Sequence, residues 1–345
     1  MALLWLEGFD SIGTSLGSNP APTGILSRRY PTVIYPDYSV LRAGRISGYS
    51  LECTAGWPDF RTPHLTTNTT LIVGFAYYCN GDHNGAIFSL YDGATLGVNL
   101  HREYGGDLGI YRGSTVLAAT SGLGLLTSTW YWIEMKVLCN GSTGTYEVRV
   151  GGVTKLSGTG ANTKAGSNNY HNIVQVVKGP GAGMCRFDDI YILDGSGAAN
   201  NDFLGNRKVV ALYPNGDIGG YTDFTCSSGS THYALVDENP INDDTDYVES
   251  GTSGHKDLWD YPSLSGTGST VNGVEVNTMV KETDAQNMTL NTLIKSGATE
   301  DAGAGEVIGA ANYKAMRRIA EVDPDTGVAW TTSGVNAAQF GIKVG

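Results

Sequence analysis

Residues 128–152, STWYWIEMKVLCNGSTGTYEVRVGG, constrain the fold more than any other part of this chain. Alternate positions of its two runs are apolar: Tyr131, Ile133, Met135 and Val137 in the first, and Tyr146, Val148 and Val150 in the second. Because successive side chains of a β-strand point to opposite faces, each run predicts a strand with one buried side. The polar turn CNGSTG between the runs predicts that the two strands form an antiparallel hairpin.

The rest of the first half repeats this pattern of short apolar segments separated by turn residues. Further strands are expected in residues 3–10, 49–55, 69–80, 85–93, 95–103, 106–120, 172–179 and 184–195. Glycine accounts for 48 of the 345 residues, and it supplies the positive φ angles that tight turns need. Long helical patterns are nearly absent. The sequence therefore predicts an all-β fold built as an antiparallel sandwich.

A break in composition divides the chain. Residues 194–206, DGSGAANNDFLGN, are mostly small and polar, which predicts a linker over residues 196–208. Alternating segments resume after it, in residues 207–217, 232–238, 243–250, 255–264, 271–284, 287–297, 313–324 and 337–345. We expect one β domain over residues 1–195 and a second, smaller β-sandwich domain over residues 209–345.

The hairpin and a later segment together resemble a known family. The strand around WIEMK, followed by CRFDDIYILDGSG near residues 185–197, is similar to the concanavalin A-like, laminin-G-like jelly-roll family. In that family a strand of this type leads into a hairpin, and a strand with paired aspartates closes the sheet. The resemblance covers residues 1–195 and implies an N-terminal concanavalin A-like jelly-roll sandwich.

The second half resembles a different group of proteins. NNDFLGNRKVVALYPNGD, HYALVDENPINDDTDYVES, GHKDLWDYPSL and EVDPDTGVAWTTSGVNAAQFGIKVG occur in that order. They resemble a block found in structural proteins of tailed bacteriophages, where it follows a jelly roll of this kind. The resemblance implies a virion component, such as a fibre, collar, tail-appendage or capsid-surface protein.

Charge and hydropathy exclude several partners. The formal net charge of −12 argues against nucleic acid and against an anionic membrane surface. No run reaches the roughly 18 apolar residues that a membrane span requires. The first residues, MALLWLEGFDSIG, lack a basic segment and a cleavage site, so no secretory signal is expected. Together with the phage resemblance, this predicts assembly in the host bacterial cytoplasm and a final location in the virion.

Catalytic patterns are missing from the sequence. Glycosidases need two carboxylates facing one groove, but Glu134 stands alone on its strand. Asp188 and Asp189 are adjacent, so on a regular strand they would point to opposite faces. No nucleophile elbow is present, and the six histidines show no metal-protease spacing. The five cysteines lack a CxxC spacing and are expected to be unpaired core or strand thiols. These observations predict a protein that is not an enzyme.

The long segment 11–48 contains the main basic and aromatic cluster of an otherwise acidic chain. Its members are Arg28, Arg29, Tyr30, Tyr35, Tyr38, Arg42 and Arg45. Arginine and tyrosine are favoured at interfaces, and loops of this length are usually functional. One interpretation is a contact surface for a neighbouring subunit. The other is a locally folded cover over the sandwich.

Two other groups of residues are candidates for ligand binding. Trp57, Phe60 and Trp259 are aromatic side chains that would stack on sugar rings if exposed, and local packing is the alternative. The acidic run DENPINDDTD, residues 237–246, contains Asp243, Asp244 and Asp246, which are candidate Ca²⁺ ligands because Ca²⁺ prefers carboxylate oxygens. A solvated turn is the competing interpretation of that run. No other cofactor is expected.

These observations predict a non-enzymatic bacteriophage structural protein. It would be tail-, fibre- or neck-associated, with capsid decoration as the next choice, and it would dock on other virion proteins. Such assemblies are usually symmetric, so a homo-oligomer is expected, with a trimer favoured. The alternative is a carbohydrate-binding module of the phage that recognises a receptor glycan on the host surface.

Overall fold

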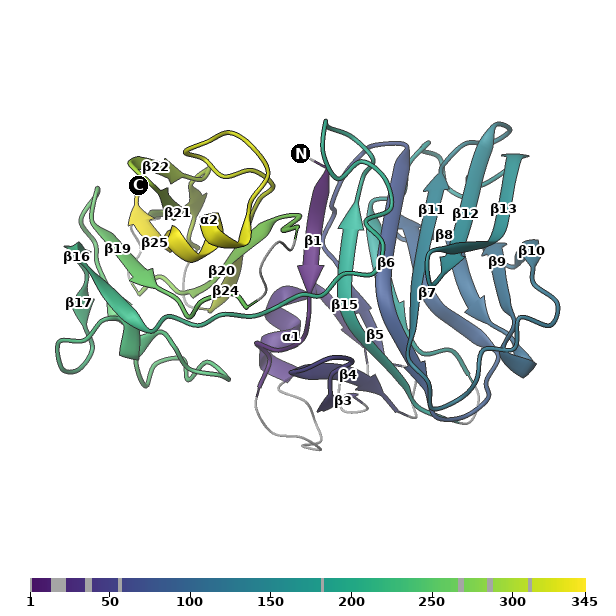
Figure 1. Ribbon diagram of the computed structural model, residues 1–345, viewed down its shortest axis with the longest axis horizontal. Helices are drawn as coiled ribbons and strands as arrows, with labels where there is room; N and C mark the ends of the chain where they lie inside the picture. The colour runs from purple at the N-terminus through teal and green to yellow at the C-terminus, as the bar shows by residue number, and fades with distance from the viewer. Residues whose placement is uncertain are drawn as a thin grey trace. The chain divides into compact units, whose positions relative to one another are not determined.

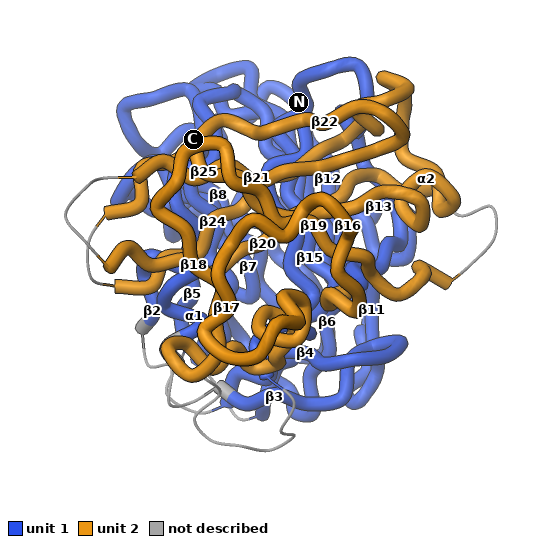
Figure 2. Tube along the Cα trace, turned by 90° about the vertical axis from the view of Figure 1, so that its left-hand side faces the viewer, with its two compact units in different colours: residues 1–210 blue, residues 211–345 orange. Residues whose placement is uncertain are grey.

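The structure is a computed structural model that describes residues 2–13, 23–34, 39–54, 58–180, 183–265, 270–283, 288–309 and 312–345. The chain divides into two compact units, residues 1–210 and residues 211–345 (Figure 2). Each unit is described by itself below. None of the helices in the described residues is long and apolar enough to cross a membrane.

The first unit contains two antiparallel sheets (Figure 1). Sheet A has the strand order β13-β12-β11-β6-β15-β4-β3, and β1 also pairs with β15. Its strands are β1 (Leu3–Glu7), β3 (Ser39–Ala43), β4 (Tyr49–Cys53), β6 (Thr70–Cys79), β11 (Tyr131–Leu138), β12 (Gly144–Val150), β13 (Val153–Ala161) and β15 (Cys185–Leu193).

Sheet B has the order β10-β9-β8-β7-β14-β5-β2. Its strands are β2 (Thr32–Ile34), β5 (Asp59–Arg61), β7 (Gly85–Asp92), β8 (Thr95–Arg102), β9 (Leu108–Arg112), β10 (Thr115–Ala119) and β14 (Ile173–Val177). One short helix, α1 (Thr23–Arg29), precedes β2, and a 3-10 turn, η2 (Tyr104–Gly106), lies between β8 and β9.

The core of the first unit lies between the two sheets. The inward positions predicted from alternation, including Ile133, Met135 and Val137 of β11, are completely buried in one apolar cluster with residues of sheet B. Phe75 of β6 and Phe88 of β7 stack across the sandwich, with ring centroids 4.4 Å apart. The predicted hairpin is confirmed, because β11 and β12 pair in register from Ile133–Val150 to Leu138–Thr145.

The second unit is smaller and also built from strands. Its main sheet, sheet C, has the order β16-β19-β25-β21-β22, with β23 also paired to β21. These strands are β16 (Gly216–Thr222), β19 (Lys256–Asp260), β21 (Thr289–Ser296), β22 (Thr299–Ala302), β23 (Glu306–Val307) and β25 (Gln339–Val344). Two further pairs are β20 (Val274–Val280) with β24 (Lys314–Ala320), and β17 (Thr225–Cys226) with β18 (Val248–Glu249). The remaining elements are η3 (Tyr233–Leu235) and α2 (Thr332–Ala337).

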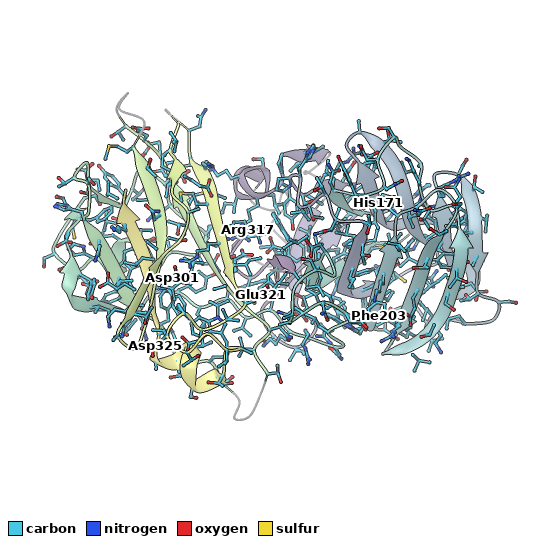
Figure 3. All side chains as sticks on the ribbon, turned by 90° about the horizontal axis from the view of Figure 1, so that it is seen from above. His171, Phe203, Asp301, Arg317, Glu321 and Asp325 are labelled. Atoms are coloured by element: carbon cyan, nitrogen blue, oxygen red, sulfur yellow. The ribbon has the colours of Figure 1, made fainter. Side chains whose placement is uncertain are left out.

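A core joins sheet C to the β20–β24 pair. Val276 of β20, Ile294 of β21, Phe340 of β25 and the buried Trp330 belong to one apolar cluster. Two ion pairs join β24 to other strands of this unit. Arg317 pairs with Glu275 of β20, and Arg318 pairs with Asp301 of β22 (Arg317 and Asp301 are labelled in Figure 3). The predicted all-β class is confirmed: a sandwich of two antiparallel sheets is followed by a smaller unit that is also built from strands.

The segment predicted to be a linker, residues 196–208, lies within the first unit and packs on the outward face of sheet A. The Phe203 ring lies 4.1 Å from the Arg149 guanidinium carbon (Phe203 is labelled in Figure 3). The backbone N–H of Gly205 donates to Glu134 Oε1 at 2.8 Å. Small and polar residues leave backbone amides accessible, and here those amides pair with carboxylates of the sheet.

Asp188 and Asp189 do not point to opposite faces, and that expectation was wrong. The register of β15 against β6 shifts between Asp188 and Tyr191, and Asp189 has a φ of 53°. This bulge brings both carboxylates to Arg45: the Arg45 backbone N–H donates to Asp188 Oδ2 at 2.7 Å, and its Nε donates to Asp189 Oδ2 at 3.0 Å. An extra residue in a strand re-aims side chains, and alternation alone does not reveal it.

Candidate functional site

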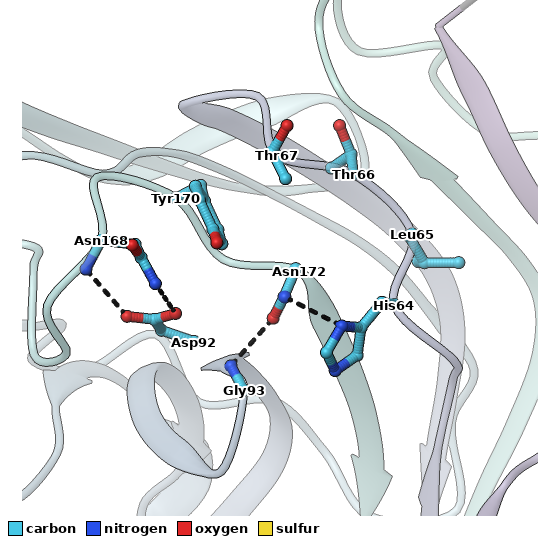
Figure 4. Close-up of a pocket in the computed structure, with 9 residues that line it drawn as sticks. All are labelled: His64, Leu65, Thr66, Thr67, Asp92, Gly93, Asn168, Tyr170 and Asn172. Carbon is cyan, nitrogen blue, oxygen red and sulfur yellow. Dashed lines mark hydrogen bonds between the residues drawn. The ribbon is translucent and has the colours of Figure 1, made fainter.

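A pocket of about 530 Å³ opens at the rim of the first unit (Figure 4). We call it the rim pocket. Three connections of the sandwich build it: the segment after β5, the β7–β8 turn and the segment before β14. The lining residues are His64, Leu65, Thr66, Thr67, Asp92, Gly93, Asn168, Tyr170 and Asn172.

Asp92 is the acidic group of the rim pocket. It is only 9% exposed, and its two oxygens accept hydrogen bonds from Asn168, one from the backbone N–H at 3.0 Å and one from the side-chain amide at 2.8 Å (Figure 4). Burial acts to raise the pKa of Asp92, but the hydrogen bonds from Asn168 outweigh it, and the pKa lies below its ordinary value. Asp92 is therefore a carboxylate with a fixed orientation, and it retains lone pairs for a ligand.

Asn172 links the β7–β8 turn to the segment after β5. Its Oδ1 accepts the backbone N–H of Gly93 at 2.9 Å, and its Nδ2 lies 3.4 Å from His64 Nδ1. Its own backbone joins the frame, because its N–H donates to the carbonyl of Tyr91 and its carbonyl accepts from the N–H of Leu65. The pocket thus has polar groups held by a hydrogen-bonded scaffold rather than by mobile side chains.

His171 lies behind the lining (labelled in Figure 3). It is buried, and within the described residues neither of its ring nitrogens has a hydrogen-bond partner. A Cβ built on Gly97 would come within 2.2 Å of His171 Nε2, so the glycine makes room for the ring. Burial lowers the pKa of His171 to about 4, which makes it a neutral packing element under ordinary conditions.

A second cluster lies on the face of sheet B that is turned away from the core. Five residues on five neighbouring strands are direct cross-strand partners: Arg61, Gln175, Ser89, Asn99 and Tyr111. We call this set the polar row. Four strand spacings of about 4.8 Å give it a length of roughly 19 Å. The residues one position along the strands, such as Phe60, Phe88 and Leu100, are in the core.

Aromatic and basic groups flank the polar row. The Arg61 guanidinium lies 4.4 Å from the ring centroid of Tyr91, whose hydroxyl donates to Gln175 Oε1 at 3.1 Å. His101 stacks on Tyr111 at 4.2 Å between centroids. Burial lowers the pKa of His101. The hydrogen bond that Tyr111 donates to Glu103, together with burial, raises the pKa of Tyr111 to about 12. A concentration of shifted titratable groups is a recognised feature of functional sites.

The basic and aromatic cluster of segment 11–48 is largely used inside the first unit. Arg29 forms an ion pair with the buried Glu7 at 3.0 Å, and Tyr30 packs in the core against Trp5 and Phe60. Arg42 pairs with Glu52 and Arg45 with Asp189. Arg28 is half-exposed at the end of α1, and Tyr35 and Tyr38 lie outside the described residues. For Arg29 and Tyr30 the structure fits the locally folded cover, because both are buried.

The aromatic residues predicted to contact a glycan are not available for stacking where the structure describes them. Phe60 is 1% exposed and packs on Tyr30, and Trp259 is buried in the core of the second unit. Trp57 lies outside the described residues. Sequence alone did not show that Phe60 faces inward, because its burial depends on packing against Tyr30, which lies far away in the chain.

The predicted calcium ligands are engaged elsewhere. Asp244 pairs with Lys281 and accepts the Tyr313 hydroxyl at 2.9 Å, and Asp246 accepts from the Asn242 amide at 3.0 Å. Asp243 has a φ of 55°, as in a turn. Across the described ranges, no group of three or more His, Cys, Asp or Glu side chains is arranged to hold a metal ion.

Sequence reasoning did not identify the residues of the rim pocket or of the polar row. The local signals for the pocket were the turn residues Asp92-Gly93 and the polar run NNYHN, residues 168–172. The signal for the polar row was the outward alternation of β7, β8 and β14. Neither signal says which outward residues on separate strands become neighbours.

Comparisons with known proteins give structural likenesses only. No family model and no curated protein sequence matches the chain. Among solved structures, alginate lyase Aly36B is similar with a TM-score of 0.42 and 12% identity, over 54% of this chain and 95% of that one. The cellulose-induced protein Cip1 has a TM-score of 0.37 and 15% identity, over 48% and 91% of the two chains. An endo-β-1,4-glucuronan lyase from the fungus Trichoderma reesei has a TM-score of 0.36 and 10% identity, over 48% and 90%.

These likenesses correct the functional interpretation made from the sequence. The prediction of a non-enzymatic virion structural protein was wrong on this comparison, because the similar structures include polysaccharide lyases. The prediction that the chain is not an enzyme was wrong on the same finding. The alternative, a carbohydrate-binding protein, agrees better with it. At this low similarity the chemistry must be argued from the chain's own residues.

Proposed function

We propose that the first unit binds carbohydrate in the rim pocket. The observation that carries the proposal is that the Asp92 carboxylate, the Asn168 and Asn172 amides and Tyr170 line one cavity of about 530 Å³. Ligand pockets for small molecules span about 300–1,000 Å³ and contain a few well-placed polar groups.

The chemistry of the lining matches a sugar ring. A sugar presents several neighbouring hydroxyls that each donate and accept, together with apolar C–H faces. Asp92 and Asn172 supply fixed acceptors and donors, and both are more than nine-tenths buried. Tyr170 supplies aromatic surface, to which the C–H face of a ring can pack. Pre-oriented polar groups reduce the entropy cost of binding.

A binding assay with the full chain tests this proposal. Isothermal titration with a panel of oligosaccharides should show saturable binding, and Tyr170→Ala should weaken it about tenfold or more. The matched control is Tyr104→Ala, because Tyr104 is 65% exposed and does not line the pocket. Equal affinity of the wild type and Tyr170→Ala, or no binding to any member of the panel, would reject the pocket as a carbohydrate site.

A second candidate function is acid–base chemistry on an acidic polysaccharide along the polar row. It is favoured by one observation: a guanidinium and two amides (Arg61, Gln175, Asn99) are aligned with His101 and Tyr111 on one face. The Gln175 amide and the Arg61 guanidinium, which also pairs with Asp59 at 2.7 Å, would stabilise charge on a uronate carboxylate when a proton leaves the adjacent carbon. A neutral histidine accepts such a proton, and a tyrosine hydroxyl supplies one to the leaving glycosidic oxygen.

This second function is tested by activity rather than by affinity. The full chain is incubated with alginate or glucuronan, and the unsaturated sugar formed by elimination is followed by its ultraviolet absorbance. Activity should fall at least a hundredfold in His101→Ala and in Tyr111→Phe, which keep the fold of the sheet. Val116→Ala, an exposed position on β10, is the control. No product from either polymer would count against this function and leave the rim pocket unaffected.

A further inference from the structure

We infer that the rim pocket selects an uncharged sugar and discriminates against the corresponding uronate. This inference rests on the proposed carbohydrate function and names the class of ligand for that site. The observation behind it is the balance of charge around the cavity. Asp92 is ionised in the lining, and none of the nine lining residues is a lysine or an arginine.

The groups behind the lining do not restore a positive charge. His171 is close enough to interact with Asp92, but it is buried and neutral. Lys164 also interacts with Asp92, yet it is half-exposed and does not line the cavity. His64, at the mouth, shares its Nδ1 with Asn172. A second carboxylate entering the pocket would therefore face an existing one without a dedicated cation.

The hydrogen-bonding groups fit hydroxyls better than a carboxylate. Asp92 can only accept, so it favours a ligand that donates. A pair of sugar hydroxyls donates to its two oxygens, whereas an ionised uronate carboxylate has no donor. Two donors beside Asp92 are already used within the protein: the Asn168 amide donates to Asp92, and the Gly93 N–H donates to Asn172 (Figure 4).

The size of the effect follows from like-charge repulsion at a partly solvated site. Two negative charges a few ångströms apart at the protein surface cost enough to lower affinity by about tenfold. The repulsion is screened by salt because the pocket is open to solvent. The overall net charge of −12 acts in the same direction on approach of an anion.

The test uses pairs of ligands that differ only in charge. Methyl glucoside, galactoside and mannoside are each titrated against the full chain, and each is compared with its own uronate at low and at high salt. We expect the wild type to bind the best neutral glycoside about tenfold tighter than its uronate, with a smaller ratio at high salt. Asp92→Asn should reduce the ratio to about threefold or less.

A second variant keeps the test informative if Asp92→Asn disturbs the loop. Thr67 is exposed at the pocket lining, so Thr67→Lys should fold normally and should raise affinity for the uronate several-fold. Thr67→Gln is its neutral control.

The outcomes separate the two proposals. Equal or tighter binding of the uronate by the wild type, lost in Tyr170→Ala, would overturn the selectivity while supporting carbohydrate binding at this site. Absence of binding to every glycoside and uronate would overturn both. The expected ratio, together with its loss in Asp92→Asn or Thr67→Lys, would support both.

Discussion

Tyr191 and Glu134 are hydrogen-bonded to each other on the outward face of sheet A, beneath residues 203–206. The Tyr191 hydroxyl donates to Glu134 Oε1 and accepts the backbone N–H of Leu204 at 3.0 Å. Glu134 is 1% exposed. The glutamate that stood alone in the sequence pattern therefore holds the segment after β15 against the sheet, where it is shielded from solvent.

The first prediction concerns this contact. Tyr191→Phe removes the hydroxyl but keeps the ring, leaving Glu134 and the Leu204 amide short of a partner. A buried group that loses its partner costs about 1–3 kcal/mol, so the free energy of unfolding should fall by about that amount. Denaturant unfolding measures it. Limited proteolysis should also cut more readily within residues 200–209. Tyr104→Phe, at an exposed position, is the control and should change neither quantity.

The second prediction concerns the aspartates at the bulge of β15. Burial, and then the neighbouring charge of Asp189, raise the pKa of Asp188 from 3.8 to about 8. Because the folded chain binds this proton more tightly than the unfolded chain, protonation of Asp188 stabilises the fold. This contribution to the free energy of unfolding is fully present below pH 3.8 and is lost as the pH rises through about 8. The wild type should therefore lose stability relative to Asp188→Asn across this window. Denaturant midpoints at several pH values measure the difference, and a constant difference would contradict the prediction.

The third prediction concerns His171, for which stability should be lost as the pH falls rather than as it rises. Burial lowers its pKa from 6.5 to about 4. A lowered folded-state pKa for a base means that stability is present above pH 6.5 and is lost as the pH falls through about 4, because the unfolded chain binds the proton more tightly. The wild type should lose stability relative to His171→Gln over this range. Val116→Ala, at an exposed position without a titratable group, is the control and should keep the pH dependence of the wild type.

The fourth prediction concerns the stacked pair that joins the two sheets. Phe88 is completely buried against Phe75, so Phe88→Ala leaves a cavity that the rigid sheets cannot fill. The expected cost is about 3–5 kcal/mol in the free energy of unfolding. Val116→Ala, at a position that is 55% exposed, should change it by no more than about 0.5 kcal/mol. A small loss in Phe88→Ala would mean that the core repacks.

The class of the fold and most of the inward positions could be predicted from local patterns in the sequence. The alternation in residues 131–137 and 146–150 predicted both the hairpin and its buried side, because the two-residue period of a strand is a local property. The change in composition near residue 200 indicated a division of the chain, and two compact units meet at residues 210 and 211. It did not indicate that the intervening segment binds to sheet A.

The residues of the candidate site, in contrast, become neighbours only through the folding of the chain. His64 and Asn172 are 108 positions apart, and Asp92 and Asn168 are 76 apart, yet each pair is in hydrogen-bond contact. Which loops meet at the rim depends on strand order, and strand order depends on non-local pairing that no local pattern records. The same reason explains the burial of Tyr30 and Phe60, and the bulge that turns Asp188 and Asp189 toward Arg45.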